Sequence, residues 1–245
     1  VNVIKEMVHD YKTEMSLEPI NIPEVRKDNG RIILKEGGSI NDIYADTFLK
    51  KDSQGYVEVK DGKYYLEKTE PVYLGKTTPD FTLGWNNSFS WKGLNFSFLI
   101  NGRFGGIVTS STQAILDRFG VSKESAESRD NGGYMLPHQG RVDAEGYYKM
   151  VGTGDFNTSG YYVYSATNIR LQEITLGYTF PNKWFKNVLK DLTLTFIAGN
   201  PWMIYCKAPY DPELTPSVGT YGQGNDYFMQ PSVRSYAFSL KFKFY

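Results

Sequence analysis

The last eleven residues, Ser235 to Tyr245, alternate strictly between two kinds of side chain. Small or basic residues fill the positions between aromatic and aliphatic ones. This alternation indicates a β-strand with one apolar face. A strand that ends a chain on aromatic residues is typical of a bacterial outer-membrane barrel, whose apolar face meets lipid and whose aromatic ends lie at the membrane interface. The apolar positions are Tyr236, Phe238, Leu240, Phe242 and Phe244.

A second stretch predicts a hairpin of the same kind. Phe81 to Trp91 alternate between apolar and uncharged polar residues, and the pattern resumes at Leu94. A two-residue turn at Lys92-Gly93 pairs Trp91 with Leu94 and places both apolar sets on one face. Each strand has roughly 11 residues, the length that a tilted strand needs to cross a bilayer. A soluble sandwich usually carries charges on its wet face, so the uncharged first strand favours a membrane location.

Two further strands, at 168–180 and 192–198, join the hairpin and the terminal strand at 234–245 to give five. The apolar phase changes near Gln172-Glu173, which predicts a β-bulge there. The fold class is therefore all-β and antiparallel. The residues expected to face lipid are Phe81, Leu83, Trp85, Phe89, Trp91, Leu94, Phe96, Phe98, Leu194, Phe196, Phe238, Leu240, Phe242 and Phe244.

Short and long connections alternate along the chain. The long outer loops are expected at about 105–160 and 201–231, with short helices at 111–119 and 123–129, and 79–245 holds all five strands. Barrels of this class have short periplasmic turns and long outer loops, which places the C-terminus on the periplasmic side. Residues 1–78 carry many turn signals and are interpreted as an extracellular loop region without a core of its own.

Aromatic residues mark the expected membrane interfaces, with ordinary core packing as the alternative. The inner interface takes Trp91, Phe180, Trp184, Phe185 and Phe244, and the outer one takes Trp202 and Tyr205.

Composition narrows the class of protein. The 245 residues have zero net charge, which gives no electrostatic case for nucleic-acid binding. No run of 18 apolar residues predicts a transmembrane helix, although barrel strands do not produce such runs. The chain starts at Val1 without Met, and we expect it to be the C-terminal part of something larger.

Four segments resemble one family, the SusC-like TonB-dependent transporters. Residues 168–181, Asn-Ile-Arg-Leu-Gln-Glu-Ile-Thr-Leu-Gly-Tyr-Thr-Phe-Pro, resemble a segment that recurs near the family's C-terminus. Val72 to Gly75 followed by Thr78 to Gly84 are similar to the sequence that leads into a hairpin there. Gly199-Asn200 followed by Tyr210-Asp-Pro-Glu resemble a family loop, although Pro201-Trp202 replaces the usual Asn-Leu type of sequence. The terminal aromatic strand completes the order, and the resemblance covers about 72–245.

The resemblance implies the last five strands of a transmembrane barrel of about 22 strands with an N-terminal plug. It implies TonB-dependent import of oligosaccharides or peptides across the outer membrane, together with a SusD-like surface lipoprotein that closes over the barrel like a lid. TonB would act through the N-terminal part, and the rest of the barrel and the plug would pair with this segment because five strands leave open edges. The alternative is a soluble β-rich carbohydrate-binding or adhesion module.

No catalytic motif, cofactor motif or zinc-ligand pattern occurs, so an enzyme is not expected. Asp42, Asp46 and Asp52 do not match a calcium-binding loop, and a solvated loop is the preferred interpretation. Asp211 and Glu213 flank Pro212 and are expected to fix their loop. Aromatic residues of the last outer loop are candidates for contact with a ligand or with the lid, by stacking on sugar rings or by packing. They are Trp202, Tyr205, Tyr210, Tyr221, Tyr227 and Phe228.

Overall fold

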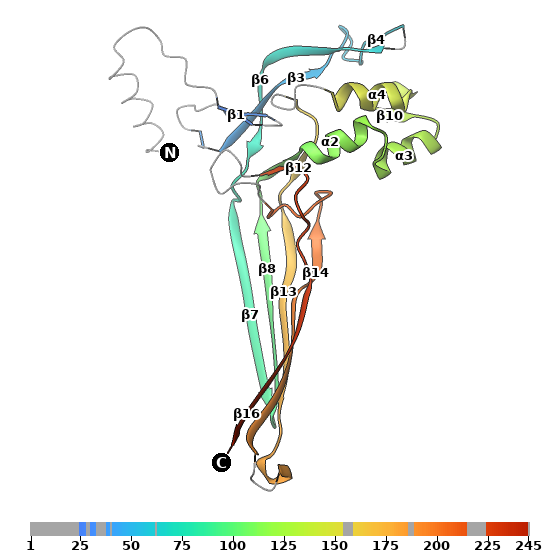
Figure 1. Ribbon diagram of the computed structural model, residues 1–245. Helices are drawn as coiled ribbons and strands as arrows, with labels where there is room; N and C mark the ends of the chain where they lie inside the picture. Colours follow the sequence, from blue (N-terminus) through green and yellow to red (C-terminus); the bar gives the residue numbers. More distant parts are fainter. Residues whose placement is uncertain are drawn as a thin grey trace, which may run out of the picture. The chain divides into compact units, whose positions relative to one another are not determined.

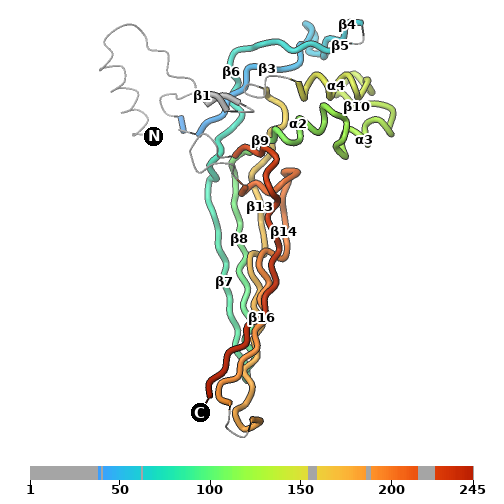
Figure 2. Tube along the Cα trace, viewed as in Figure 1, coloured from blue at the N-terminus to red at the C-terminus, as the bar shows by residue number. Residues whose placement is uncertain are grey.

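The computed structural model describes residues 25–27, 30–32, 38–39, 41–61, 63–153, 159–185, 189–214 and 224–244. These residues form two compact units (Figures 1 and 2). Unit 1 draws on the described residues of 1–78, 106–165 and 213–229, and unit 2 on those of 79–105, 166–212 and 230–245. None of the described helices is long and apolar enough to cross a membrane.

Unit 2 is a five-stranded antiparallel sheet with a short 3₁₀ helix. The strand order is β16-β14-β13-β8-β7, so neighbours in the sheet follow the order of the chain, as Figure 1 shows. This arrangement confirms the five strands that the alternation predicts. The elements are β7 (Phe81–Trp91), β8 (Leu94–Phe104), β13 (Asn168–Thr179), η1 (Asn182–Phe185), β14 (Leu189–Cys206) and β16 (Ser235–Phe244).

The predicted hairpin and the predicted bulge are both confirmed. Trp91 pairs with Leu94 across the turn. Lys92 and Gly93 have φ angles of 45° and 89°, which are the two positive values of a type I′ turn. The register of β13 against both of its neighbours shifts between Leu171 and Glu173. The shift lets the apolar residues on either side of the bulge share one face.

The start predicted for the last outer loop is wrong, because β14 continues to Cys206. Pro201 suggested a loop, since proline cannot donate a ladder hydrogen bond. In the structure, Asn200 adopts a φ of 53° and the register of β14 against β13 is interrupted between Gly199 and Trp202. The irregularity accommodates the proline, and regular pairing resumes at Trp202 with Leu171.

Unit 1 combines three small sheets, a two-stranded hairpin and three helices. β4 and β5 pair as a small hairpin, with Val59 opposite Tyr64 and Lys60 opposite Lys63. Two of the helices, α2 and α3, confirm the predicted helices at 111–119 and 123–129. The elements are β1 (Val25–Lys27), β2 (Gly30–Ile32), β3 (Asp42–Leu49), β4 (Val59–Lys60), β5 (Lys63–Tyr64), β6 (Leu66–Lys76), β9 (Ile107–Ser110), α2 (Ser111–Arg118), α3 (Lys123–Asp130), β10 (Tyr134–Leu136), β11 (Gly140–Val142), α4 (Ala144–Val151), β12 (Val163–Ser165) and β15 (Asn225–Asp226).

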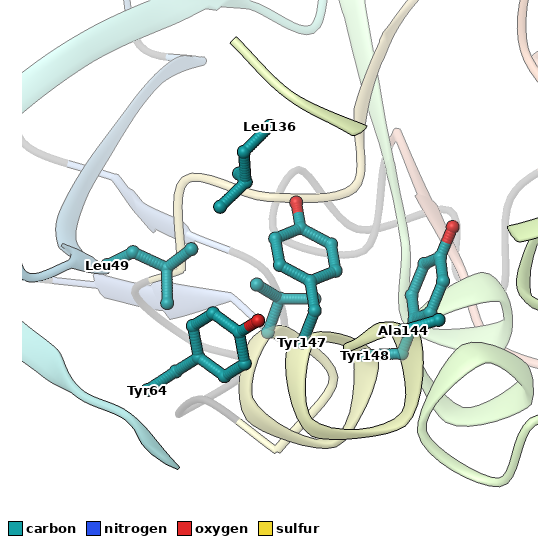
Figure 3. Close-up of a cluster of buried hydrophobic side chains, with 7 residues drawn as sticks. Leu49, Tyr64, Leu136, Ala144, Tyr147 and Tyr148 are labelled. Carbon is teal, nitrogen blue, oxygen red and sulfur yellow. The ribbon is translucent and has the colours of Figure 1, made fainter. Parts of the chain in front are cut away.

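Unit 1 has a buried core, shown in Figure 3, which residues of 1–78 share with later segments instead of forming one of their own. Leu49 and Tyr64 pack with Leu136, Tyr147 and Tyr148, so the core joins residues of the first 78 with residues of the long connection after β8. Tyrosines supply most of its volume, and their amphipathic rings give little periodic signal in the sequence. The core also explains why α4 forms, because its inward positions follow helical spacing.

Candidate membrane-facing surface and ligand-contact residues

One face of the unit 2 sheet is apolar from edge to edge. The register aligns five side chains in a single row across all five strands: Phe89, Phe96, Leu176, Phe196 and Phe238. Within β7 and β8, the residues of this face that are not apolar are Asn87 and Gly102, and none carries a charge. The face also carries Phe81, Leu83, Trp85, Trp91, Leu94, Phe98, Ile174, Tyr178, Leu194, Tyr236, Leu240, Phe242 and Phe244.

The apolar face is open rather than packed. Phe238 is 76% exposed and Leu83 is 59% exposed. Every position of β16 is exposed. The buried hydrophobic residues among the described part of unit 2 are Ala166 and Ala198 alone. A single sheet without a second layer has no core of its own, so this face requires an apolar environment from outside the described residues.

The opposite face is polar and largely uncharged in its middle. Ser90 donates a hydrogen bond to Asn95 Oδ1 at 2.7 Å, and Asn101 donates one to Gln172 Oε1. The hydroxyls of Thr179 and Thr193 also lie 3.0 Å apart, within hydrogen-bond distance. Hydrogen bonds between neighbouring strands therefore satisfy part of this face, as the lining of a barrel interior requires.

Aromatic residues gather at both ends of the apolar face. At the end with the short connections, Trp91, Trp184 and Phe244 are 68%, 61% and 73% exposed. At the other end, Phe81 stacks on Phe104 with ring centroids 4.7 Å apart. The ten residue steps from Phe81 to Trp91 span about 33 Å along the strand. At a strand tilt of about 40°, this length gives a height of about 25 Å, the height of the apolar band of outer-membrane barrels.

A buried ion pair fixes the turn after β14. Arg170 on β13 donates two hydrogen bonds to the carboxylate of Asp211, at 2.6 Å and 3.1 Å. Both side chains are less than a tenth exposed. The expectation that Asp211 holds its loop is therefore confirmed, and the pair joins two of the segments that carry the family resemblance.

The candidate ligand-contact residues are divided between the two units. Trp202 and Tyr205 lie on β14 rather than in a loop, in register with the apolar face. Tyr210 is half-buried, and its carbonyl oxygen lies 3.6 Å from Cys206 Sγ. These three belong to unit 2, whereas Tyr227 and Phe228 belong to unit 1. Tyr221 lies outside the described residues.

Tyr227 and Phe228 are the exposed members of the set in unit 1, at 56% and 57%. Their rings meet edge to face, with centroids 5.4 Å apart. The Phe228 amide donates to Thr112 Oγ1 at 2.6 Å, and Asp226 accepts a hydrogen bond from Ser110 at 2.8 Å. These bonds hold the aromatic pair against the N-terminus of α2.

The three aspartates considered for calcium interact with their own chain. Asp42 accepts a hydrogen bond from the Ser39 amide, and Asp52 accepts two from the amides of Gln54 and Tyr56. Asp42 and Asp46 are buried, so the solvated-loop interpretation is wrong for both. The described residues contain no group of three or more His, Cys, Asp or Glu that could hold a metal ion.

A tyrosine-lined cavity lies in unit 1 and was not predicted from the sequence. One side of it is α4, whose inward residues Ala144, Tyr147, Tyr148 and Val151 follow helical spacing after the cap Asp143. That spacing and that cap are a helix signal. The signal alone gives no cavity, because the other walls come from α2, α3 and the segment before β13.

Comparisons with known proteins agree with this geometry. No family model matches the sequence. TonB-dependent receptor P3 of Formosa agariphila is 22% identical over 190 residues, which cover 75% of this chain and 18% of the receptor. TonB-dependent receptor P39 of the same organism is 29% identical over 177 residues, which cover 70% of this chain and 17% of that receptor. The chain thus spans less than a fifth of the length of these relatives.

Two solved structures share the fold. The match to the RagAB peptide importer in its closed-closed state covers 90% of this chain and 24% of the importer chain, with a TM-score of 0.57 and 14% identity. The match to the RagAB peptide transporter covers 80% of this chain and 22% of the transporter chain, with a TM-score of 0.50 and 17% identity. Sequence and fold together confirm the resemblance that the motifs indicate: this chain is similar to part of the SusC-like TonB-dependent receptors.

Proposed function

We propose that unit 2 is part of the wall of a bacterial outer-membrane barrel and that the whole protein imports nutrients in a TonB-dependent manner. The observation that carries this proposal is the open apolar face, which runs uncharged across five strands. Lipid is the apolar environment that a single sheet of this kind fits, because its other face is polar and its strands are long enough to cross a bilayer.

The open edges of the sheet support a larger barrel. β7 and β16 are its edge strands, and within the described residues neither has a partner on its outer side. Unpaired backbone groups are costly in lipid, so these edges require further strands. We place them in a barrel of about 22 strands with an N-terminal plug, in keeping with the family resemblance.

The cargo and partners that we propose are based on the relatives of this chain. The solved relatives are described as a peptide importer and a peptide transporter. We propose oligosaccharides or peptides as cargo, a SusD-like lipoprotein as the lid and TonB as the source of energy. The C-terminus lies on the periplasmic side in this arrangement, since Phe244 pairs with Leu189 at the end of the sheet that carries the short connections.

Spin labels test the orientation of the sheet in the membrane. Labels at Leu83, Phe96, Leu194 and Phe242 should be relaxed by oxygen dissolved in lipid and shielded from a water-soluble nickel complex. A label at Ser97, the neighbour of Phe96 on the opposite face, is the matched control and should show less contact with oxygen. Equal contact with the nickel complex at all positions would favour the soluble carbohydrate-binding or adhesion module instead.

A transport experiment tests the import itself. The gene for the whole protein is deleted, and growth on defined oligosaccharides and on peptides is compared with growth on their monomers. Loss of growth on one polymer class alone identifies the cargo. Unchanged growth and uptake on both classes contradict the import proposal.

A further inference from the structure

A cavity of about 250 Å³ lies within unit 1, among the helices α2, α3 and α4 and the tyrosines that precede β13. Acidic and aromatic side chains share its wall. The residues that matter for its chemistry are Asp117, Glu124, Tyr147, Tyr148, Tyr162 and Tyr164.

Two carboxylates meet at one side of the cavity without a cation between them. Gln113 Nε2 donates to Asp117 Oδ1 at 2.9 Å and to Glu124 Oε2 at 3.0 Å. Asp117 is only 4% exposed. Across the residues that the structure describes, neither carboxylate has an ion-pair partner. A buried carboxylate near a like charge is unfavourable until an opposite charge arrives.

The aromatic side of the cavity holds a polar atom without a well-formed hydrogen bond. The hydroxyl oxygen of Tyr162 is buried and interacts with the carboxylate of Asp117, but within the described residues it has no hydrogen-bond partner of suitable geometry. Tyr162 also has a φ of 62°, an uncommon backbone conformation for a bulky residue. A buried unpaired hydroxyl is costly, so a ligand atom at this position would be stabilised.

The remaining tyrosines form a fixed frame. Tyr148 shares a hydrogen bond of 3.0 Å with Ser128, and its ring meets that of Tyr147 edge to face, with centroids 5.3 Å apart. Burial raises the pKa of the Tyr164 hydroxyl, so that side chain stays neutral. Neutral aromatic faces next to carboxylates attract organic cations.

We propose that this cavity binds an organic ammonium or guanidinium group. The cation lies against the carboxylates of Asp117 and Glu124 and donates a hydrogen bond to the buried hydroxyl of Tyr162. The volume accommodates a single side chain or amine head group rather than an extended chain. The group comes either from a basic side chain of a peptide or from the amine of an amino sugar.

The site does not depend on the proposed import. Binding of a small cation is measured on the purified whole protein in detergent, without TonB and without transport. Failure of binding therefore leaves the import proposal untouched, and failure of import leaves the site testable.

Isothermal titration provides the test, with four probes in two pairs. Nα-acetyl-lysine methylamide is compared with the uncharged Nα-acetyl-norleucine methylamide, and glucosamine with N-acetylglucosamine. We expect one cationic probe to bind and its neutral partner not to bind. The pair that shows the difference identifies the source of the group.

Variants locate the binding within the protein. Asp117→Asn should weaken binding of the cationic probe about tenfold or more, since a charged hydrogen bond is lost. Glu124 is exposed, so Glu124→Gln provides a second test if Asp117→Asn does not fold. This variant should weaken binding about threefold. Glu127→Gln, on the same helix and paired with Lys123 outside the cavity, is the matched control and should bind like the wild type. Equal binding of charged and neutral probes, no binding of any probe, or the same affinity in Glu124→Gln and Glu127→Gln would overturn the proposal.

Discussion

Arg170 and Asp211 form a two-fold hydrogen-bonded ion pair that is almost completely buried, with Nη2 and Oδ1 2.6 Å apart. The arginine belongs to the segment 168–181 and the aspartate to the segment 210–213, and the two residues lie 41 positions apart in the chain. The pair thus ties the turn that follows β14 to the neighbouring strand.

Removal of one partner of this pair should be strongly destabilising. Asp211→Ala leaves the guanidinium of Arg170 buried without its charge partner, which costs about 3–5 kcal/mol of unfolding free energy. Urea unfolding in lipid measures the effect, and a double-mutant cycle with Arg170→Ala measures the coupling. Asp191→Asn, which breaks the exposed pair with Lys243, is the control and should unfold like the wild type. Independent, additive losses at 170 and 211 would contradict the assigned role.

A charge on the apolar face should oppose insertion. Phe96→Arg places a guanidinium in the middle of the row that faces lipid and should cost about 2–4 kcal/mol. Ser97→Arg places the same group one residue later, on the polar face, and should cost much less. Folding free energy in vesicles, followed by the shift of the folded band in electrophoresis, measures both variants. Similar costs for the two would mean that the faces are wrongly assigned.

The tight turn of the first hairpin should require Gly93. Its φ is 89°, and a Cβ there would lie 2.6 Å from the carbonyl oxygen of Thr179 on β13, the neighbour of β8. Gly93→Ala should therefore destabilise the sheet by roughly 1–2 kcal/mol or more. Lys92→Gly, at a φ of 45°, relieves strain at the adjacent turn position and should be neutral or mildly stabilising. The midpoint of urea unfolding distinguishes the two.

The stability of unit 1 should depend on pH through Asp117. Burial raises the pKa of this carboxyl above its ordinary value of 3.8, against opposing interactions with Ser122, Tyr162 and Gln113. Between the ordinary and the raised pKa, the folded state binds a proton that the unfolded state has released, so stability falls as the pH rises through that window.

Asp117→Asn removes this proton equilibrium. We expect the variant to gain melting temperature relative to the wild type at pH 7, and to gain less at about pH 3.5, where the carboxyl is protonated in the folded wild type. Near-ultraviolet circular dichroism of the tyrosines follows the transition. The same comparison with Glu124→Gln separates the contribution of the neighbouring carboxylate on α3. A gain that is independent of pH would contradict the raised pKa.

Local pattern was sufficient to predict the sheet. Alternation predicts β7, β8 and β16, and the change of phase at Gln172-Glu173 predicts the bulge, because a one-residue shift moves every later side chain to the other face. The same logic failed at Pro201, where Asn200 with a positive φ and an interrupted register let the strand continue. A proline is a strong signal against a strand, and the sequence does not show that the chain bends around it.

The local sequence pattern did not predict the core of unit 1 or its cavity. Leu49, Tyr64, Leu136 and Tyr147 come from segments far apart in the chain, and none of them forms a long periodic run. Tyr162 and Asp117 meet at the cavity only because α2 and the segment before β13 fold together. Residue type within an expected loop predicts the ligand-contact candidates, but Trp202 and Tyr205 lie on a strand.

The three-stranded sheet of unit 1 has a consequence for any exchange of its connections. The connection between β8 and β13 supplies β9 and β12, and the connection between β14 and β16 supplies β15, so neither connection forms the sheet alone. Thr109 on β9 bonds to Asn225 on β15, and Ser110 bonds to Asp226. A connection grafted from a relative would therefore bring one part of a composite fold without its counterparts. Exchange of either connection therefore requires a matching change in the other.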